Sequence, residues 1–286
     1  MVKKKLEILN KCVAAILALV LFCVLVYGAM ESEKGTDDSY KVVCLGDSNF
    51  GNVRDETGII FRLERKLNTK ILNGAFGGST LVTTEGKRTE YQSVLSMYNL
   101  AISICNHNFG VQKASIDTLN RSSKTENYVE TLDKLANVNF DAVELLIIEH
   151  GVNDYLSGVP IKNGDDLYDT STFTGTLRSV INMLRKEYPQ IRIVLVTPSY
   201  CSPTAADGSY RYCDETDYGG GYLEEYVNAE LVVAEEMGVE IVDLYHLLDM
   251  NQENFDTYLY DGLHFNEYGR EIVADILAEC LLGDTE

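Results

Sequence analysis

The sequence contains no tryptophan and only four prolines among its 286 residues, which excludes a proline-rich, low-complexity or collagen-like chain. Basic residues are also scarce, since 24 lysines and arginines stand against 44 acidic residues and the formal net charge is -20. So acidic a protein repels nucleic acid, whose backbone is also negative. We therefore expect no nucleic-acid partner. We interpret the excess acid as a solubilising surface rather than as a device for binding a cationic substrate.

Cysteine is present but not dense, and seven is an odd number, so a disulfide framework is not expected. Cys201 and Cys213 lie 12 residues apart in one predicted loop and can pair if the compartment is oxidising. The others fall in apolar stretches, two of them in an N-terminal run and three in the predicted core: Cys12, Cys23, Cys44, Cys105 and Cys280. Neither C-x-x-C nor H-x-x-x-H spacing occurs, so the sequence predicts no metal site and no cofactor.

An uncharged apolar run occupies residues 12–30 (CVAAILALVLFCVLVYGAM) and predicts a transmembrane segment. Its 19 residues would form a helix about 28 Å long, close to the thickness of a bilayer core. Lysines precede this run, so the positive-inside rule predicts a cytoplasmic N-terminus (1–11) and an extracytoplasmic remainder. A cleaved signal peptide, which would make the protein secreted, is the alternative. Cleavage after Ala29 would leave bulky Tyr27 where a small residue is required, so we predict a signal anchor in a bacterial-type cell membrane.

Beyond the anchor, residues 31–40 form a polar linker and residues 41–286 a single domain of ordinary globular composition. Short runs rich in Val, Ile and Leu predict strands at 42–46, 71–73, 142–149, 191–197 and 239–243. Helical periodicity alternates with these runs, at 57–67, 89–105, 125–137, 171–187, 220–237 and 267–282. This alternation indicates βαβ units and an α/β fold whose parallel sheet is covered on both faces. Two stretches are less regular, 80–124 outside its one predicted helix and 198–219, and both predict long loops.

Small and polar residues follow several of these strands, at the edge of the sheet where ligands of such folds bind. The four blocks are GDSN at 46–49, NGAFGGST at 73–80, HGVNDY at 150–155 and YDGLHFNEYG at 260–269. They supply the residue types of nucleophilic acyl transfer. A serine hydroxyl needs an imidazole to take its proton, and the imidazole needs a carboxylate to orient it. Asp261 and His264 are three residues apart, so one tight turn can deliver both to the serine.

Together the four blocks resemble those of the SGNH or GDSL hydrolase family of serine esterases and lipases. The family's motifs occur here in its order, as Gly46-Asp47-Ser48, a glycine-rich turn ending at Gly78, Gly151-Val152-Asn153-Asp154 and Asp261-Gly262-Leu263-His264. The resemblance covers about residues 40–282. It implies a flavodoxin-like three-layer αβα sandwich with a five-stranded parallel sheet in the order 2-1-3-4-5. That order reverses between the strands that end at Ser48 and Asn153.

The resemblance also implies a role for each matching residue. Ser48 would be the nucleophile, His264 the general base and Asp261 the carboxylate that orients the base. The oxyanion hole would consist of the backbone N–H groups of Ser48 and Gly78 and the side-chain amide of Asn153. These five residues are the predicted catalytic site.

Residues beside the motifs receive supporting roles. Gly78 is chosen over Gly77 because the family places this glycine five residues after an asparagine such as Asn73. Asp47 is expected to hydrogen-bond the surrounding turns. Asn49 replaces the leucine of the family's name and is expected to be a turn former.

The sequence offers four histidines for the role of base. His246 lies on an apolar stretch and is expected to be a packed or surface histidine, and His107 has no carboxylate beside it. His150 directly precedes the Asn153 motif and is a candidate substrate contact. His264 is assigned as the base because of its D-x-x-H context.

The sequence therefore predicts a hydrolase acting on ester bonds, a serine esterase tethered outside a membrane. Acetyl esters on cell-envelope or extracellular polysaccharide are the expected substrates, while small-molecule esters, lipid esters and thioesters stay open. One alternative is an O-acyltransferase that passes the acyl group from the same triad to a sugar hydroxyl. Another is a non-catalytic glycan-binding module, against which the intact set of five site residues argues.

Overall fold

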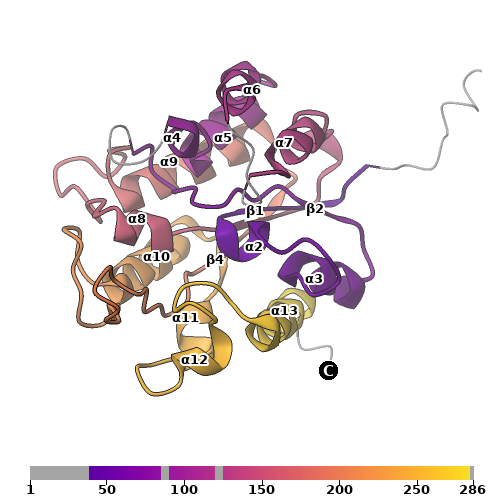
Figure 1. Cartoon of the computed structure of the whole chain (residues 1–286). Coiled ribbons are helices and arrows are strands. Elements are labelled where there is room, and N and C mark those ends of the chain that lie inside the picture. Colours follow the sequence, from indigo (N-terminus) through magenta and orange to yellow (C-terminus); the bar gives the residue numbers. More distant parts are fainter. Residues whose placement is uncertain (1–38, 85–89, 120–124, 284–286) are drawn as a thin grey trace, which may run out of the picture. The chain divides into compact units, whose positions relative to one another are not determined.

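The computed structural model describes residues 39–84, 90–119 and 125–283 (Figure 1). The predicted cytoplasmic segment and anchor, 1–30, and nearly all of the linker lie outside the described residues. Within the described ranges, no helix has both the length and the apolar character needed to cross a bilayer.

A parallel five-stranded sheet forms the centre of the described chain, in the order β2-β1-β3-β4-β5. Its strands are β1 (Val42–Gly46), β2 (Ile71–Asn73), β3 (Leu145–Glu149), β4 (Arg192–Val196) and β5 (Glu240–Val242). The predicted α/β class and strand order are confirmed. The order reverses between β1 and β3, whose register pairs Gly46 with Glu149 at the carboxyl end of both strands.

Helices cover both faces of the sheet. The longer ones are α3 (Ile59–Leu67), α5 (Met97–Cys105), α6 (Gly110–Asp117), α7 (Tyr128–Ala136), α9 (Phe173–Glu187), α10 (Leu223–Met237) and α13 (Glu267–Leu282). Figure 1 shows α3 and α13 on one side of the sheet and α5, α7 and α9 on the other. α3 packs against α13, while α5 and α10 both pack against α9. The strands are therefore covered on both faces, which is why β1 and β3 are buried throughout and have no polar alternation.

The described chain also contains short helices, which are α2 (Ser48–Gly51), α4 (Glu90–Val94), α8 (Val152–Leu156), α11 (Leu244–Leu247) and α12 (Phe255–Tyr258). All of these except α4 lie where the sequence predicts neither a helix nor a strand, and α6 forms in a part of 80–124 that the sequence predicts to be a loop. The predicted helix 89–105 is two helices, because Ser96 starts α5 by accepting the Asn99 N–H at 3.4 Å. The predicted strand 142–149 begins only at Leu145, because the 3₁₀ turn η1 (Phe140–Ala142) precedes it.

The last helix forms as its sequence predicts. Asn266 caps α13 by accepting the Gly269 N–H at 2.9 Å, and Glu267 lies in the first turn, where its charge suits the helix dipole. Val273 and Leu277 lie on the buried stripe of this helix. Cys280 lies off that stripe and is exposed, so its assignment to the core is wrong, whereas Cys44 is buried as expected.

Cys201 and Cys213 lie side by side in the long loop after β4, and both are buried. The Cys213 N–H donates to the Cys201 carbonyl at 3.1 Å, and the Cys201 N–H donates to Cys213 Sγ at 3.4 Å. Both are free thiols in this structure, so the predicted pairing in an oxidising compartment stays a prediction.

Core packing in β3 can be tested with one pair of substitutions. Leu146 is 0% exposed, so Leu146→Ala leaves a cavity and should lower the free energy of unfolding by about 2–5 kcal/mol. Leu247 is 54% exposed, so Leu247→Ala should change the free energy of unfolding by less than about 0.5 kcal/mol. Urea unfolding followed by circular dichroism measures both, and equal effects would contradict the described core.

Candidate active site

The nucleophile motif forms a tight connection between β1 and the single-turn helix α2. Asp47 lies between them and caps α2, since its Oδ1 accepts the Asn49 N–H at 2.9 Å. Ser48 is the first residue of the turn and is 8% exposed. Gly46 leaves space for a neighbouring side chain, because a Cβ there would lie 3.0 Å from Glu149 Oε2.

Ser48, His264 and Asp261 form a continuous hydrogen-bonded chain. His264 Nε2 lies 3.0 Å from Ser48 Oγ, although the two residues are 216 positions apart in the sequence. His264 Nδ1 lies 2.7 Å from Asp261 Oδ2. In this arrangement the carboxylate orients the imidazole through Nδ1, and the imidazole points its Nε2 at the serine hydroxyl.

Asp261 also organises the backbone of its own turn. Its Oδ1 accepts the N–H groups of Leu263 at 3.0 Å and of His264 at 2.8 Å. Partial burial opposes ionisation of Asp261, but the hydrogen bonds and charge of His264 outweigh it and hold the pKa of the carboxyl below its usual value. The carboxylate is therefore charged at neutral pH and keeps His264 Nδ1 in its donor form.

The long loop after β4 supports this turn. The Ser202 N–H donates to the Gly262 carbonyl at 2.6 Å. Gly262 has φ +77°, and a Cβ there would lie 1.9 Å from the Ser202 carbonyl oxygen, so the contact requires glycine. The predicted loop 198–219 thus contacts the segment that carries Asp261 and His264.

The glycine-rich turn after β2 lies beside Ser48. Phe76 N–H donates to the Gly46 carbonyl at 2.9 Å, and Ser79 Oγ donates to the same oxygen at 3.2 Å. A Cβ on Gly77 would lie 3.7 Å from Ser48 Cβ. The backbone of the glycine-rich turn is therefore in van der Waals range of the Ser48 side chain. Gly78 has φ +75°, a left-handed conformation that glycine adopts without strain.

The third motif joins the first through side chains. Asn153, on α8, donates from Nδ2 to Asp47 Oδ2 at 2.8 Å. Asp154 is fully buried and accepts the N–H groups of Leu81 at 2.8 Å and Val82 at 2.9 Å. α8 therefore ties the nucleophile turn to the segment that follows the glycine-rich turn.

The structure joins Ser48, His264 and Asp261 by hydrogen bonds, and it places the turn of Gly78 and the helix of Asn153 on segments bonded to Gly46 and Asp47. His150 is 2% exposed beside the backbone of Ser79, and burial lowers its pKa to about 3, so its ring is neutral. Its contact with a substrate stays a prediction. His246 pairs with Asp243 at 2.7 Å, so D-x-x-H spacing occurs twice and does not by itself identify the base. His264 differs from His246 in that its Nε2 contacts Ser48 Oγ.

Two neighbours of the site were not predicted from the sequence. Glu149, assigned only to a strand, reaches the nucleophile turn, and the Asp47 N–H donates to its Oε2 at 3.3 Å. Tyr260 stacks on the His264 ring, with centroids 5.8 Å apart and planes 20° apart, and is 63% exposed. The register of a parallel pair and the stacking of two rings in one turn are not visible as sequence patterns.

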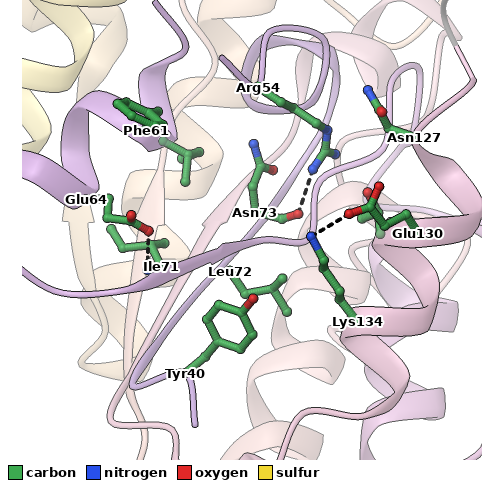
Figure 2. Close-up of a pocket in the computed structure, with 12 residues that line it drawn as sticks. Tyr40, Arg54, Phe61, Glu64, Ile71, Leu72, Asn73, Asn127, Glu130 and Lys134 are labelled. Carbon is green, nitrogen blue, oxygen red and sulfur yellow. Dashed lines mark hydrogen bonds and ion pairs between the residues drawn. The ribbon is translucent and has the colours of Figure 1, made fainter. Parts of the chain in front are cut away.

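A cavity of about 320 Å³ lies at the β2 edge of the sheet, away from the triad (Figure 2). Arg54 lines it and donates to the carbonyls of Gly51 at 2.9 Å, Asn73 at 2.8 Å and Ala75 at 2.6 Å. Its guanidinium therefore ties the end of α2 to the end of β2. This bracing fixes the two segments that carry Ser48 and Gly78.

Comparison with known proteins agrees with this geometry. The family model of the GDSL-like Lipase/Acylhydrolase family matches residues 42–277. The chain belongs to this family. A curated relative, the isoamyl acetate-hydrolyzing esterase 1 homolog of Bos taurus, is 30% identical over 135 residues, which are 46% of this chain and 53% of the relative. The match thus spans about half of that relative's length.

Solved structures show the same fold at low identity. A protein from Lactobacillus plantarum has a TM-score of 0.57 at 18% identity, over 84% of this chain and 95% of its own. Est24, a carbohydrate acetylesterase from Sinorhizobium meliloti, has a TM-score of 0.52 at 14% identity, over 85% of this chain and 99% of its own. These likenesses support the GDSL-type fold of the described chain.

The role of Asp154 in joining α8 to residues 81–82 gives a stability test. Asp154→Ala leaves two buried N–H groups without their acceptor, at about 1–3 kcal/mol each, so the free energy of unfolding should fall by about 2–6 kcal/mol. Asp154→Asn keeps one acceptor oxygen and should cost less. Urea unfolding compares the three proteins, and an alanine variant as stable as wild type would contradict the role.

Proposed function

We propose that this protein is a serine esterase that removes short acyl groups, acetyl above all, through an acyl-enzyme on Ser48. The observation that carries the proposal is the hydrogen-bonded chain from Ser48 Oγ to His264 Nε2 at 3.0 Å and from His264 Nδ1 to Asp261 at 2.7 Å. Membership of the GDSL-like family supports the same chemistry.

In the first half-reaction, Ser48 Oγ attacks the ester carbonyl while His264 Nε2 takes the hydroxyl proton. Asp261 stabilises the imidazolium that forms and keeps its Nε2 directed at Ser48. The tetrahedral intermediate then expels the alcohol, whose oxygen receives the proton from His264 Nε2. The products are the free alcohol and an ester of the acyl group on Ser48.

The negative charge on the carbonyl oxygen needs donors that are already in place. In the proposal these are the backbone N–H groups of Ser48 and Gly78 and the amide of Asn153. Preorganised donors of this kind each contribute about 2.7–4 kcal/mol to the transition state in other enzymes. Bonds to the Gly46 carbonyl and to Asp47 hold these groups on neighbouring elements, so little reorganisation is needed.

In the second half-reaction, water attacks the acyl-enzyme and His264 again takes the proton, this time from the water. Collapse of the second intermediate returns that proton to Ser48 Oγ and releases the carboxylic acid. A sugar hydroxyl in place of water would give the O-acyltransferase reaction with the same residues.

The alcohol side of the site is open. The side chains of His264 and Asp261 are 21% and 40% exposed, and Tyr260 beside them is 63% exposed. A bulky alcohol such as a polysaccharide can therefore approach the imidazole that protonates it. The acetyl part of the proposal draws on the curated relative, which is named as an enzyme hydrolysing isoamyl acetate.

The proposed substrate location follows from the uncharged run at 12–30, which would anchor the protein with residues 41–286 outside the membrane. Esters of cell-envelope or extracellular polysaccharide are then within reach of the site. Small-molecule and lipid esters are the other substrates to compare.

The proposed activity is tested with p-nitrophenyl acetate and with an acetylated polysaccharide. Wild type should release p-nitrophenol and acetate, Ser48→Ala should reduce both to background, and Asn153→Ala should lower kcat by about 10²–10³-fold. Ser209→Ala, at an exposed serine of the loop after β4, is a control expected to stay active. Wild type as inactive as Ser48→Ala would contradict the esterase.

A glycan added to the same assay separates hydrolysis from transfer. Acyl transfer to the glycan that outpaces acetate release would identify an acyltransferase. Tight glycan binding without turnover, unaffected by Ser48→Ala, would identify a binding module.

The proposed location is tested by protease protection on intact bacterial cells that produce the full chain. External protease should remove residues beyond the linker from the membrane fraction, because these residues would lie outside. A cytoplasmic protein of known location is the control. Full protection until the cells are lysed would contradict the anchor orientation.

A further inference from the structure

Glu149, the last residue of β3, is a buried carboxyl group that the proposed reaction does not use. Its side chain is 2% exposed, and its strand partner Gly46 has no side chain to occupy the space above the sheet. The carboxyl lies over Gly46 and reaches the next residue, whose N–H donates to Glu149 Oε2 at 3.3 Å. That next residue is Asp47, directly before Ser48.

Asp47 is therefore a second buried carboxyl in contact with the first. It is 0% exposed, and it accepts hydrogen bonds from the Asn49 N–H at 2.9 Å and from Asn153 Nδ2 at 2.8 Å. Hydrogen bonds donated to a carboxylate favour its charged form. Glu149 reaches Asp47 at its backbone N–H, and the Asp47 side chain is among the groups that raise the pKa of Glu149.

Ionisation of both of two neighbouring buried carboxyl groups is strongly disfavoured, so we expect the pair to hold one proton at neutral pH. Burial first, and then the charges of Asp47 and Glu230, raise the pKa of Glu149 well above its usual value, which the Asp47 N–H opposes only in part. The Asp47 charge also acts on the Cys201 thiol, whose pKa is raised chiefly by Cys213 and by burial, and on the Tyr128 hydroxyl, whose pKa is raised chiefly by burial. Glu149 is thus the member that keeps the proton.

We propose that Glu149 is a positioning residue that, as a neutral carboxylic acid, fixes the Asp47 carboxylate, which in turn holds the Asn153 amide in place. One oxygen of Glu149 accepts the Asp47 N–H, and the other donates its proton to the Asp47 carboxylate. Because Asn153 matters here as a donor of the proposed oxyanion hole, this inference rests on the proposed function.

The proposal predicts in which direction kcat changes with pH. When Glu149 gives its proton to solvent hydroxide, two negative charges face each other and the hydrogen bond between them is lost. Asp47 must then move, and the Asn153 amide loses its alignment. A donor that acts on the oxyanion affects the transition state more than substrate binding, so kcat should fall with rising pH while KM changes little.

Glu149→Gln reproduces the neutral acid without its titration, because the amide oxygen accepts and the NH₂ group donates. The variant should have a kcat close to wild type at pH 7 and should lack the alkaline loss that wild type shows. Glu149→Leu removes both hydrogen bonds and should lower kcat by about 10²–10³-fold. If the leucine variant fails to fold, the glutamine variant alone decides the matter.

Glu230→Gln is the matched control. Glu230 is 3% exposed and has a raised pKa from burial and from Asp154 and Asp243, so it is also a buried acid. It lies on α10 rather than in the nucleophile turn, so its variant should keep the alkaline loss of kcat, but displaced to lower pH because a charge that raises the pKa of Glu149 is removed. Wild-type and Glu149→Gln profiles that superimpose would overturn the proposal.

Infrared difference spectroscopy tests the neutral acid without reference to activity. At pH 7, the spectrum of wild type minus Glu149→Gln should contain the carbonyl band of a protonated carboxylic acid. Absence of that band would overturn the proposal even in an active enzyme. An inactive wild type that shows the band would contradict the proposed function but would still support a neutral Glu149.

Discussion

The Asp47 carboxylate is the group on which the arrangement of the site depends. One of its oxygens caps α2 and so sets the direction of the serine turn, while the other accepts the Asn153 amide from α8. β1 and β3, which these segments follow, are neighbours only because the strand order reverses between them. A single buried side chain therefore relates the nucleophile motif to the asparagine motif at the switch point of the sheet.

The remaining parts of the site are held to the same place by backbone contacts. The Gly46 carbonyl accepts bonds from Phe76 and Ser79, which brings the glycine-rich turn next to Ser48. The Asp261–His264 turn comes from the C-terminal part of the sequence. Its Gly262 packs against the Ser202 backbone and accepts the Ser202 N–H. The proposed ester chemistry would need only small motions, because these contacts hold the proposed donors and base on segments that meet near the serine.

The sequence predicts the sheet well because the strands are buried on both faces and stand out as apolar runs, as in Val42–Leu45. It also predicts that Ser48, His264 and Asp261 come together, since their motifs contain the residue types that acyl transfer requires, and these three are hydrogen-bonded in the structure. It does not reveal the short helices α2 and α8, because a single turn has too few residues to show a period. The role of Glu149 depends on its register opposite Gly46, a property of two strands about a hundred residues apart. The spacing of Asp243 and His246 shows the limit of a local motif, because it matches that of Asp261 and His264 without a serine partner.

The central claim is that Ser48 is a nucleophile activated by His264, and a serine-directed fluorophosphonate tests it most directly. The full chain is incubated with the probe, digested and mapped by mass spectrometry, with His264→Ala as the comparison. The account predicts one modified peptide that carries the label on Ser48, and labelling that is strongly slowed in the histidine variant. Modification at a different serine, or equal labelling of both proteins, would contradict it.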